Sequence, residues 1–492
     1  MEFTELADYP LPAGTVIEWT PMTTATNVWV TDDRALSHLH EEHCVRSGGS
    51  VGGESSWLGT IFKIPLPFDQ GAVRTTLRRW MARHDAFRTT AATDDARQNR
   101  FVRYTCRADE VQVAARHVGH LRSGTRVYQH LAEFFGTRLS PTEWPHCLVA
   151  TVSDTGTTDE AGFLLVFGAD HSVMDAYSMM LAISEIQRIY RAALTAEPLE
   201  LPEVGSYIDF GADDRAVGST MTADHPAVHH WQRYLRREGG RFPAFPLPIA
   251  PRATQRPSSS RRATGHRRPL HRSTFHQSGL SSWVLTAQQA DQLQARSRAA
   301  GHSTQSAVFA ALAAAHRVLI GSQPLRCAMP VHTRHAPEHA HAMGWYVGLL
   351  PLEIDHTGAD TFDTLLARTT AAIDSTKSLA RYPFPRIAAL LDSTEVPRFV
   401  VSYVDVRFVP DAALWQQWGV RPLRSGEQSD DEVYLWIARS PGGIAVSARF
   451  PSNEVAAANV HRFINTFTAM LSTVTTQGTL VDRRTDVAPA AG

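Results

Sequence analysis

The sequence predicts an α/β fold divided into two lobes, and two observations support this expectation. The chain has 492 residues, which is too long for one ordinary hydrophobic core, so two cores are expected. Short apolar runs typical of strands also alternate with segments of helical spacing in both halves of the sequence. With 43% hydrophobic and 20% charged residues, the composition is typical of a soluble globular protein.

Residues 1–194 form the predicted first lobe. The apolar runs Val149 to Val152 and Phe163 to Phe167 predict neighbouring strands, because the turn between them, Ser153 to Glu160, is polar and rich in Thr, Asp and Gly. The second run is uninterrupted and bounded by Gly168, which is typical of a strand buried on both faces. The other elements expected here are a strand from Trp57 to Leu66, a helix from Val73 to His84, and a helix with apolar positions at Met179, Met180, Ile183, Ile186 and Tyr190.

Residues 195–280 are expected to cross from one lobe to the other. They hold an aromatic helix around His229 to Leu235 and a Pro-punctuated stretch from Phe242 to Pro251. The segment Arg252 to Arg272 follows, with seven arginines and no acidic residue. Two interpretations of this basic loop stay open. It is either a solvated insertion or a contact for a phosphate, such as the nucleotide end of coenzyme A or an acidic carrier protein.

Residues 281–492 form the predicted second lobe. Thr286 is expected to cap a helix from Ala287 to Arg298, and Ser303 or Thr304 a helix that runs to Ile320. Strands are expected around Arg326 to Val331, Tyr346 to Ile354, Phe399 to Val406, Val433 to Ala438 and Gly443 to Phe450, and a closing helix over Glu454 to Val474.

Charge, cysteines and hydropathy exclude several classes of function. A net charge of -1 gives no electrostatic basis for binding nucleic acid. The four cysteines (Cys44, Cys106, Cys147 and Cys327) lack paired spacing, so reduced thiols in a cytoplasmic protein are expected. Because the start of the chain is acidic and lacks a basic region followed by an apolar stretch, no secretory signal is expected. No segment reaches the roughly 20 uninterrupted apolar residues that a transmembrane helix needs.

The most informative motif lies directly after the predicted strand at Phe163 to Phe167. His171 and Asp175 stand four residues apart, on the loop that leads into the following helix. A strand end is a rigid scaffold from which a loop commonly presents a reacting group. Asp175 is close enough in the chain to orient the imidazole or to brace the loop. The spacing alone also occurs by chance in structural histidines, so the surrounding sequence has to decide.

That sequence resembles the His-His-x-x-x-Asp-Gly signature of the condensation-domain superfamily, which includes chloramphenicol acetyltransferase-like enzymes. It departs from the signature at Asp170, in place of the first His, and at Ala176, in place of the Gly. Further similar elements are Arg-His-Asp-Ala-Phe-Arg-Thr from Arg83 to Thr89, Gly344 to Leu352, and segments such as Trp19 to Pro21 and Tyr382 to Arg386. The first two of these elements resemble the superfamily as a whole, whereas Trp19 to Pro21 and Tyr382 to Arg386 are similar to the polyketide-associated (Pap) acyltransferases.

The resemblance implies two chloramphenicol acetyltransferase-like lobes in a V arrangement, with the active site in a tunnel between them. It implies that His171 is the catalytic group and that Asp175 pairs with Arg334 as structural support of the active site. Candidates for the substrate tunnel are Asp170, Trp345, Tyr346, Ser402 and Asp405.

The expected activity is transfer of an acyl group from a thioester, either acyl-CoA or a carrier-protein pantetheine, to an acceptor hydroxyl. A neutral imidazole is a suitable general base because its unperturbed pKa lies near neutral pH. Since no cysteine is placed as a nucleophile, direct attack without an acyl-enzyme is expected, and no cofactor is expected.

Two alternatives stay open: a free-standing condensation enzyme that forms an amide or ester between carrier-bound units, and a non-catalytic protein that binds a carrier or partner. Two histidine-rich stretches also resemble metal sites, but neither has paired-ligand spacing, so no metal is expected. They contain His38, His40, His43 and Cys44, and His332, His335, His339 and His341.

Overall fold

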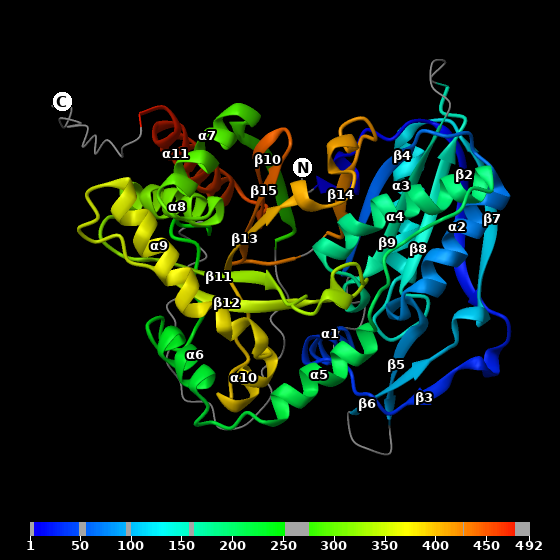
Figure 1. The fold of residues 1–492 in the computed structure, drawn as a ribbon, viewed down its shortest axis with the longest axis horizontal. Helices are drawn as coiled ribbons and strands as arrows, with labels where there is room; N and C mark the ends of the chain where they lie inside the picture. Colours follow the sequence, from blue (N-terminus) through cyan, green and yellow to red (C-terminus); the bar gives the residue numbers. More distant parts are fainter. Residues whose placement is uncertain are drawn as a thin grey trace.

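The computed structural model describes residues 4–48, 56–94, 100–156, 162–250, 275–426 and 428–477. The described residues form an α/β architecture with two large sheets and one small sheet. Figure 1 shows two lobes side by side, one built mainly from the first half of the chain and the other mainly from the second. The predicted α/β class and its two lobes are confirmed. The basic loop from Arg252 to Arg272 and part of the predicted turn before Phe163 lie outside the described residues.

The first lobe is built on a seven-stranded sheet with the order β1-β14-β4-β9-β8-β2-β7. At its centre, β9 (Phe163–Asp170) pairs antiparallel with both β8 (Cys147–Ser153) and β4 (Trp57–Ile64), as the two apolar runs predict. The remaining strands are β1 (Thr4–Glu5), β2 (Gly14–Thr23), β7 (Val111–Leu121) and β14 (Arg421–Arg424).

Both faces of this sheet are covered, which explains why β9 has no polar alternation. Successive side chains of a strand point to opposite faces, so Leu165 and Phe167 enter one core and Val166 the other. The first core is closed by α2 (Gln70–Arg83) and α4 (Ala176–Thr195), and the second by α3 (Gly124–Arg138).

A smaller sheet and two helices lie at the lower end of the first lobe in Figure 1. The sheet has the order β3-β6-β5. Its strands are β3 (Val30–Asp32), β5 (Thr89–Asp94) and β6 (Arg100–Thr105), and the helices are α1 (His38–Gly48) and α5 (Tyr207–Ser219). Helix α5 begins where the Ser206 hydroxyl accepts the Asp209 N–H (3.0 Å). It belongs to the crossover predicted over residues 195–280.

The second lobe is built on a six-stranded sheet with the order β10-β16-β15-β13-β11-β12. The strands are β10 (Gln277–Thr286), β11 (Leu325–His332), β12 (Val347–Ile354), β13 (Phe399–Asp405), β15 (Val433–Ser440) and β16 (Gly443–Pro451). The helices are α6 (Pro226–Arg236), α7 (Ala287–Ala299), α8 (Thr304–Ile320), α9 (Phe362–Thr376), α10 (Phe384–Leu390) and α11 (Glu454–Gln477). The predicted caps are confirmed: Thr286 forms a capping box at α7 and Ser303 caps α8.

One segment of the second half of the chain becomes part of the first lobe. Strand β14 pairs antiparallel with β4 and parallel with β1, in the first sheet. Residues that lead to it, including Val406, Trp415 and Val420, are buried in the core between that sheet and α4. The division of the chain at residues 194 and 281 stays a prediction. The sequence did not suggest that β14, from the second half of the chain, would join the sheet of the first lobe.

Among the described helices, not one combines the length and the apolar character that a bilayer crossing requires. The apolar helix α8, the best candidate in the sequence, is buried over most of its length in the core of the second lobe.

Candidate active site

His171 lies at the end of β9, on a single 3-10 turn (His171–Val173) that precedes α4. Its backbone N–H donates to the Ser56 carbonyl (3.0 Å), which fixes the residue beside the start of β4. The residue is half-buried rather than enclosed, and its ring packs on Trp345 with centroids 4.1 Å apart. The predicted position, on a loop between a strand and a helix, is confirmed.

The protein environment favours the neutral form of the His171 ring. Burial lowers the pKa of His171, and the nearby His43 lowers it further. Nδ1 is enclosed and contacts the residue's own backbone without a well-formed hydrogen bond to another described group. The nitrogen available to an acceptor molecule is therefore Nε2.

Asp175 faces away from the imidazole and toward the second lobe. Arg334 donates from Nη1 to Asp175 Oδ2 (2.6 Å) and from Nη2 to Oδ1 (3.1 Å). The carboxylate also accepts the Tyr346 N–H (2.9 Å) and, as N-cap of α4, the Ser178 N–H (2.7 Å). Burial alone would raise the pKa of Asp175, but the Arg334 charge and these hydrogen bonds lower it, so the group is ionised.

Ser178 and His84 add two further bonds between the lobes. The Ser178 hydroxyl donates to the Gly344 carbonyl (2.9 Å) and lies 2.5 Å from Arg334 Nη2. The Met343 N–H donates to His84 Nδ1 (3.4 Å), and His84 Nε2 lies 2.8 Å from the Glu185 carboxylate. The loop before β12 is thus bound to α4 and to the end of α2 through buried polar groups.

Asp170, which replaces the first His of the signature, is fully buried and binds another histidine. Its Oδ1 accepts from His43 Nε2 on α1 (3.1 Å) and from the Ser172 N–H (2.8 Å). Burial would raise the pKa of Asp170, but the His43 charge and the hydrogen bonds lower it to about 2. The sequence assigned no such role to His43, although a buried Asp needs hydrogen-bond donors.

The other four tunnel candidates lie in different environments. Trp345 is half-buried against His171, whereas Tyr346 is fully buried, with the Arg334 guanidinium 4.3 Å from its ring centroid. Asp405 caps its own 3-10 turn and binds Arg407 with both oxygens (2.9 and 2.6 Å). Ser402 is half-buried on β13 opposite Trp436. Contact with substrate stays a prediction for these residues and for Asp170.

The two histidine-rich stretches do not converge. His43 binds Asp170, His40 stacks near Tyr207 and the His38 backbone binds Asp214. The His332 ring stacks near Tyr177, and the His339 ring lies tilted against Tyr346. Within the described ranges, no group of three His, Cys, Asp or Glu side chains is arranged to hold a metal ion. All four cysteines are free and buried, and burial raises the pKa of each thiol.

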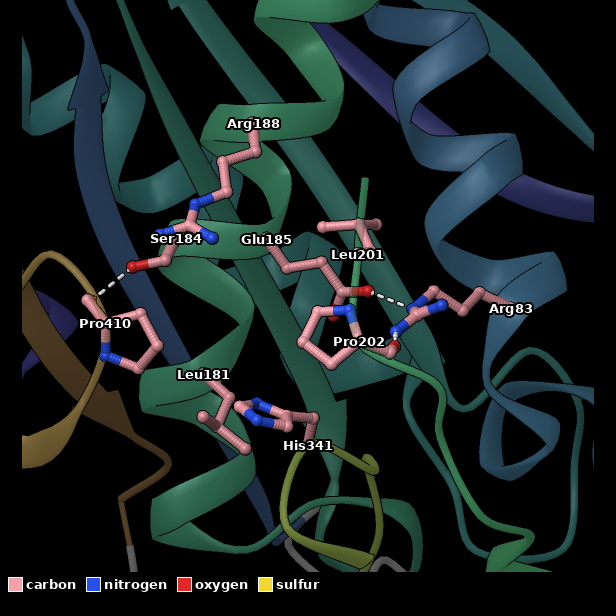
Figure 2. Close-up of a pocket in the computed structure, with 9 residues that line it drawn as sticks. All are labelled: Arg83, Leu181, Ser184, Glu185, Arg188, Leu201, Pro202, His341 and Pro410. Carbon is pink, nitrogen blue, oxygen red and sulfur yellow. Dashed lines mark hydrogen bonds and ion pairs between the residues drawn. The ribbon is translucent and has the colours of Figure 1, made fainter. Parts of the chain in front are cut away.

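A small pocket opens along α4 beyond the site (Figure 2). It is lined by Leu181, Ser184, Glu185 and Arg188 of α4, by Arg83, Leu201 and Pro202, and by His341 and Pro410 from the second half of the chain. Its charged side chains are paired: Arg83 with Glu185 (2.6 Å), and Arg188 with Asp411 (3.2 Å). The Ser184 hydroxyl donates to the Pro410 carbonyl (2.5 Å). The pocket therefore lies where the segment that leads to β14 is bound to α4.

Comparisons with known proteins agree with this geometry. Residues 51–491 match the family model of the condensation domain. The chain is 24% identical to the acyltransferase PapA3 of Mycobacterium tuberculosis, over 95% of this chain and 98% of that protein. It is 25% identical to the 2'-acyl-2-O-sulfo-trehalose (hydroxy)phthioceranyltransferase PapA1 of the same species, over 64% of this chain and 59% of that protein.

Among solved structures, the PapA2 acyl transferase has a TM-score of 0.81 and 21% identity, covering 97% of this chain and 100% of that one. This likeness shows the same fold, and the family model covers most of the sequence. The chain therefore belongs to the condensation-domain family, and it is an acyltransferase of that family.

Proposed function

We propose that this acyltransferase moves an acyl group from a thioester, either acyl-CoA or a carrier-bound pantetheine, to an acceptor hydroxyl, with His171 as general base. The observation that carries the proposal is the His171 ring: it is half-buried, favoured in the neutral form, and leaves Nε2 available beside Trp345. A neutral imidazole in such a position removes a proton efficiently at neutral pH.

In the proposed reaction, Nε2 takes the hydroxyl proton as the oxygen attacks the thioester carbonyl. A carbon–oxygen bond forms, the carbon–sulfur bond breaks, and the departing thiolate receives the proton from the imidazolium. No cofactor is needed, and no covalent acyl-enzyme forms. Holding both substrates in the predicted tunnel supplies a large part of the rate enhancement, because their orientation is fixed before reaction.

The contacts of Asp175 support a positioning role instead of a catalytic one. Four donors from Arg334, Ser178 and Tyr346 occupy its carboxylate, so it does not hydrogen-bond to His171. It therefore acts on the reaction by fixing the start of α4 and the loop that carries Trp345.

The name of one relative suggests which acceptor to test first. PapA1 is named for transfer to an acylated sulfotrehalose, so we propose a sugar or glycolipid hydroxyl as the acceptor class. The purified chain should be incubated with palmitoyl-CoA and trehalose, long-chain alcohols or amines, while free thiol and product mass are followed. Ester formation from an alcohol or sugar is expected, and amide formation with amines alone would instead indicate the condensation-type alternative.

Two variants complete the test. His171→Ala should abolish turnover and leave the melting temperature unchanged, whereas substitution of the exposed His120 by Gln should leave both unchanged. Wild-type turnover in His171→Ala would contradict the mechanism. Binding of thioesters or of carrier proteins loaded with them, without turnover of any donor in the wild type, would favour the non-catalytic alternative.

A further inference from the structure

The ring of Trp345 lies against the ring of His171, and the mechanism described so far gives this contact no role. The two centroids are 4.1 Å apart, and the ring planes differ by 32°. Rings that meet edge-on lie farther apart, as the His43 ring does against the same Trp345, at 5.7 Å and 88°. The imidazole of His171 therefore lies over the face of the indole, within the roughly 6 Å at which a cation is attracted to an aromatic ring.

Hydrogen bonds from the start of α4 hold Trp345 through the residues on both sides of it. Before it, the Ser178 hydroxyl donates to the Gly344 carbonyl (2.9 Å), and the Gly344 N–H lies 3.1 Å from the same hydroxyl oxygen. After it, the Tyr346 N–H donates to Asp175 Oδ2 (2.9 Å). Because α4 directly follows the turn that carries the base, one rigid element fixes the positions of both rings.

In the proposed reaction the His171 ring becomes positively charged, and no carboxylate of the described residues hydrogen-bonds to its enclosed Nδ1. Asp175 is occupied by Arg334 and by two backbone N–H groups. Asp170 is occupied by His43 and by one backbone N–H. Burial, the largest influence on the pKa of His171, disfavours the charge, as does His43, and the two carboxylates favour it only from a distance. Direct contact with the new charge is left to the indole.

An aromatic face attracts a cation electrostatically, most strongly when the ring is tryptophan and the contact is shielded from water. We propose that Trp345 is a positioning residue that stabilises the imidazolium form of His171 through the face of its indole ring. The inference rests on the proposed function and deepens it. The proton still moves from the hydroxyl through His171 to the departing thiolate, and Trp345 forms and breaks no bond. Because the attraction increases when the base gains the proton, it lowers the barrier and leaves substrate binding unchanged.

The test replaces Trp345 alone with tryptophans that carry increasing numbers of fluorine atoms, introduced by stop-codon suppression. Fluorine withdraws electron density from the ring face and hardly alters the shape of the ring. In the palmitoyl-CoA assay, kcat should fall stepwise along the series, by about fivefold to thirtyfold in total, with KM unchanged. The acidic limb in the profile of kcat/KM against pH should move to lower pH in the same order, because the imidazolium loses stabilisation. The same fluorinated tryptophans in place of Trp231, in the core of the second lobe, are the control and should change neither quantity.

Trp345→Phe gives a second measurement, because phenylalanine keeps a ring whose face attracts a cation less strongly. It should lower kcat and move the acidic limb to lower pH. If Trp345 only shielded His171 from water, the smaller ring would admit solvent, and the limb would move toward about pH 6.5, the ordinary pKa of histidine. That result, or wild-type kcat and pH profiles throughout the fluorinated series, would overturn the role of Trp345. The proposed function would survive it as long as His171→Ala is inactive in the same assay, whereas an active His171→Ala would overturn the proposed function itself.

Discussion

Replacement of Asp175 by alanine should destabilise the protein through two separable effects. The side chains of Asp175 and Arg334 retain only 2% and 3% of their exposure, so solvent does not screen the pair. Removing one partner of such a buried pair costs about 3–5 kcal/mol of the free energy of unfolding. In Asp175→Ala, Arg334 would keep its contacts with the Ser178 hydroxyl, the Ala342 carbonyl and the face of the Tyr346 ring. Because these contacts partly compensate the buried charge, we expect a loss in the lower half of that range. Loss of the N-cap adds about 1 kcal/mol.

Asparagine separates the two effects because it keeps an acceptor for the Ser178 N–H but not the charge. Asp175→Asn should therefore be more stable than Asp175→Ala by about 1 kcal/mol. Combining Asp175→Asn with Arg334→Met should recover part of the loss, because no unpaired charge stays buried.

The assay is urea unfolding followed by tryptophan fluorescence, with the midpoint of the first transition as the measured quantity, since two lobes can unfold in separate steps. Asp109→Asn is the matched control: it breaks a carboxylate–arginine pair in which both side chains are largely exposed, 65% and 80%. That variant should leave the midpoint unchanged. A wild-type midpoint for Asp175→Ala would refute the reasoning that this ion pair joins the lobes.

Two further predictions concern the site. Gly344→Ala should destabilise the protein and lower activity, because a Cβ there would lie 2.4 Å from the Tyr207 ring at a φ of +153°. The control is Gly358→Ala, which has a φ of +63° and open space around it and should lower the free energy of unfolding by only about 1 kcal/mol. Equal melting temperatures of the two variants would contradict this prediction. Burial and His43 lower the pKa of His171, so the base stays unprotonated to more acidic pH. The acidic limb in the profile of kcat/KM against pH should therefore lie below about pH 6.5, the ordinary pKa of histidine. An acidic limb above about pH 7 would contradict this prediction.

Local signals in the sequence were sufficient for most of the fold. The pairing of β8 with β9 follows from two apolar runs and a polar turn, and the caps at Thr286 and Ser303 follow from single side chains next to helical spacing. Predicting the position of His171 required only the apolar run before it and the helical spacing after it. These features depend on residues within a few positions of each other, which is the range that periodicity and capping patterns describe.

Contacts between distant residues could not be predicted in the same way. His43 and Asp170 are 127 residues apart, and the histidine-rich stretch around His43 suggested only a metal site, which its spacing did not support. The partner of Asp175, Arg334, followed only from a family resemblance. Strand β14 has four residues, with an arginine at each end and a proline between them, so it lacks the composition typical of strands.

The position of β14 also has a consequence for biosynthesis. While the ribosome is still making the second half of the protein, β4 has no neighbour on one side, because that neighbour is residues 421–424. An open strand edge is a template for incorrect pairing with other chains. The nascent first lobe therefore stays vulnerable to aggregation until almost the entire polypeptide has been translated, and a fragment that ends before β14 should need a chaperone to remain dispersed.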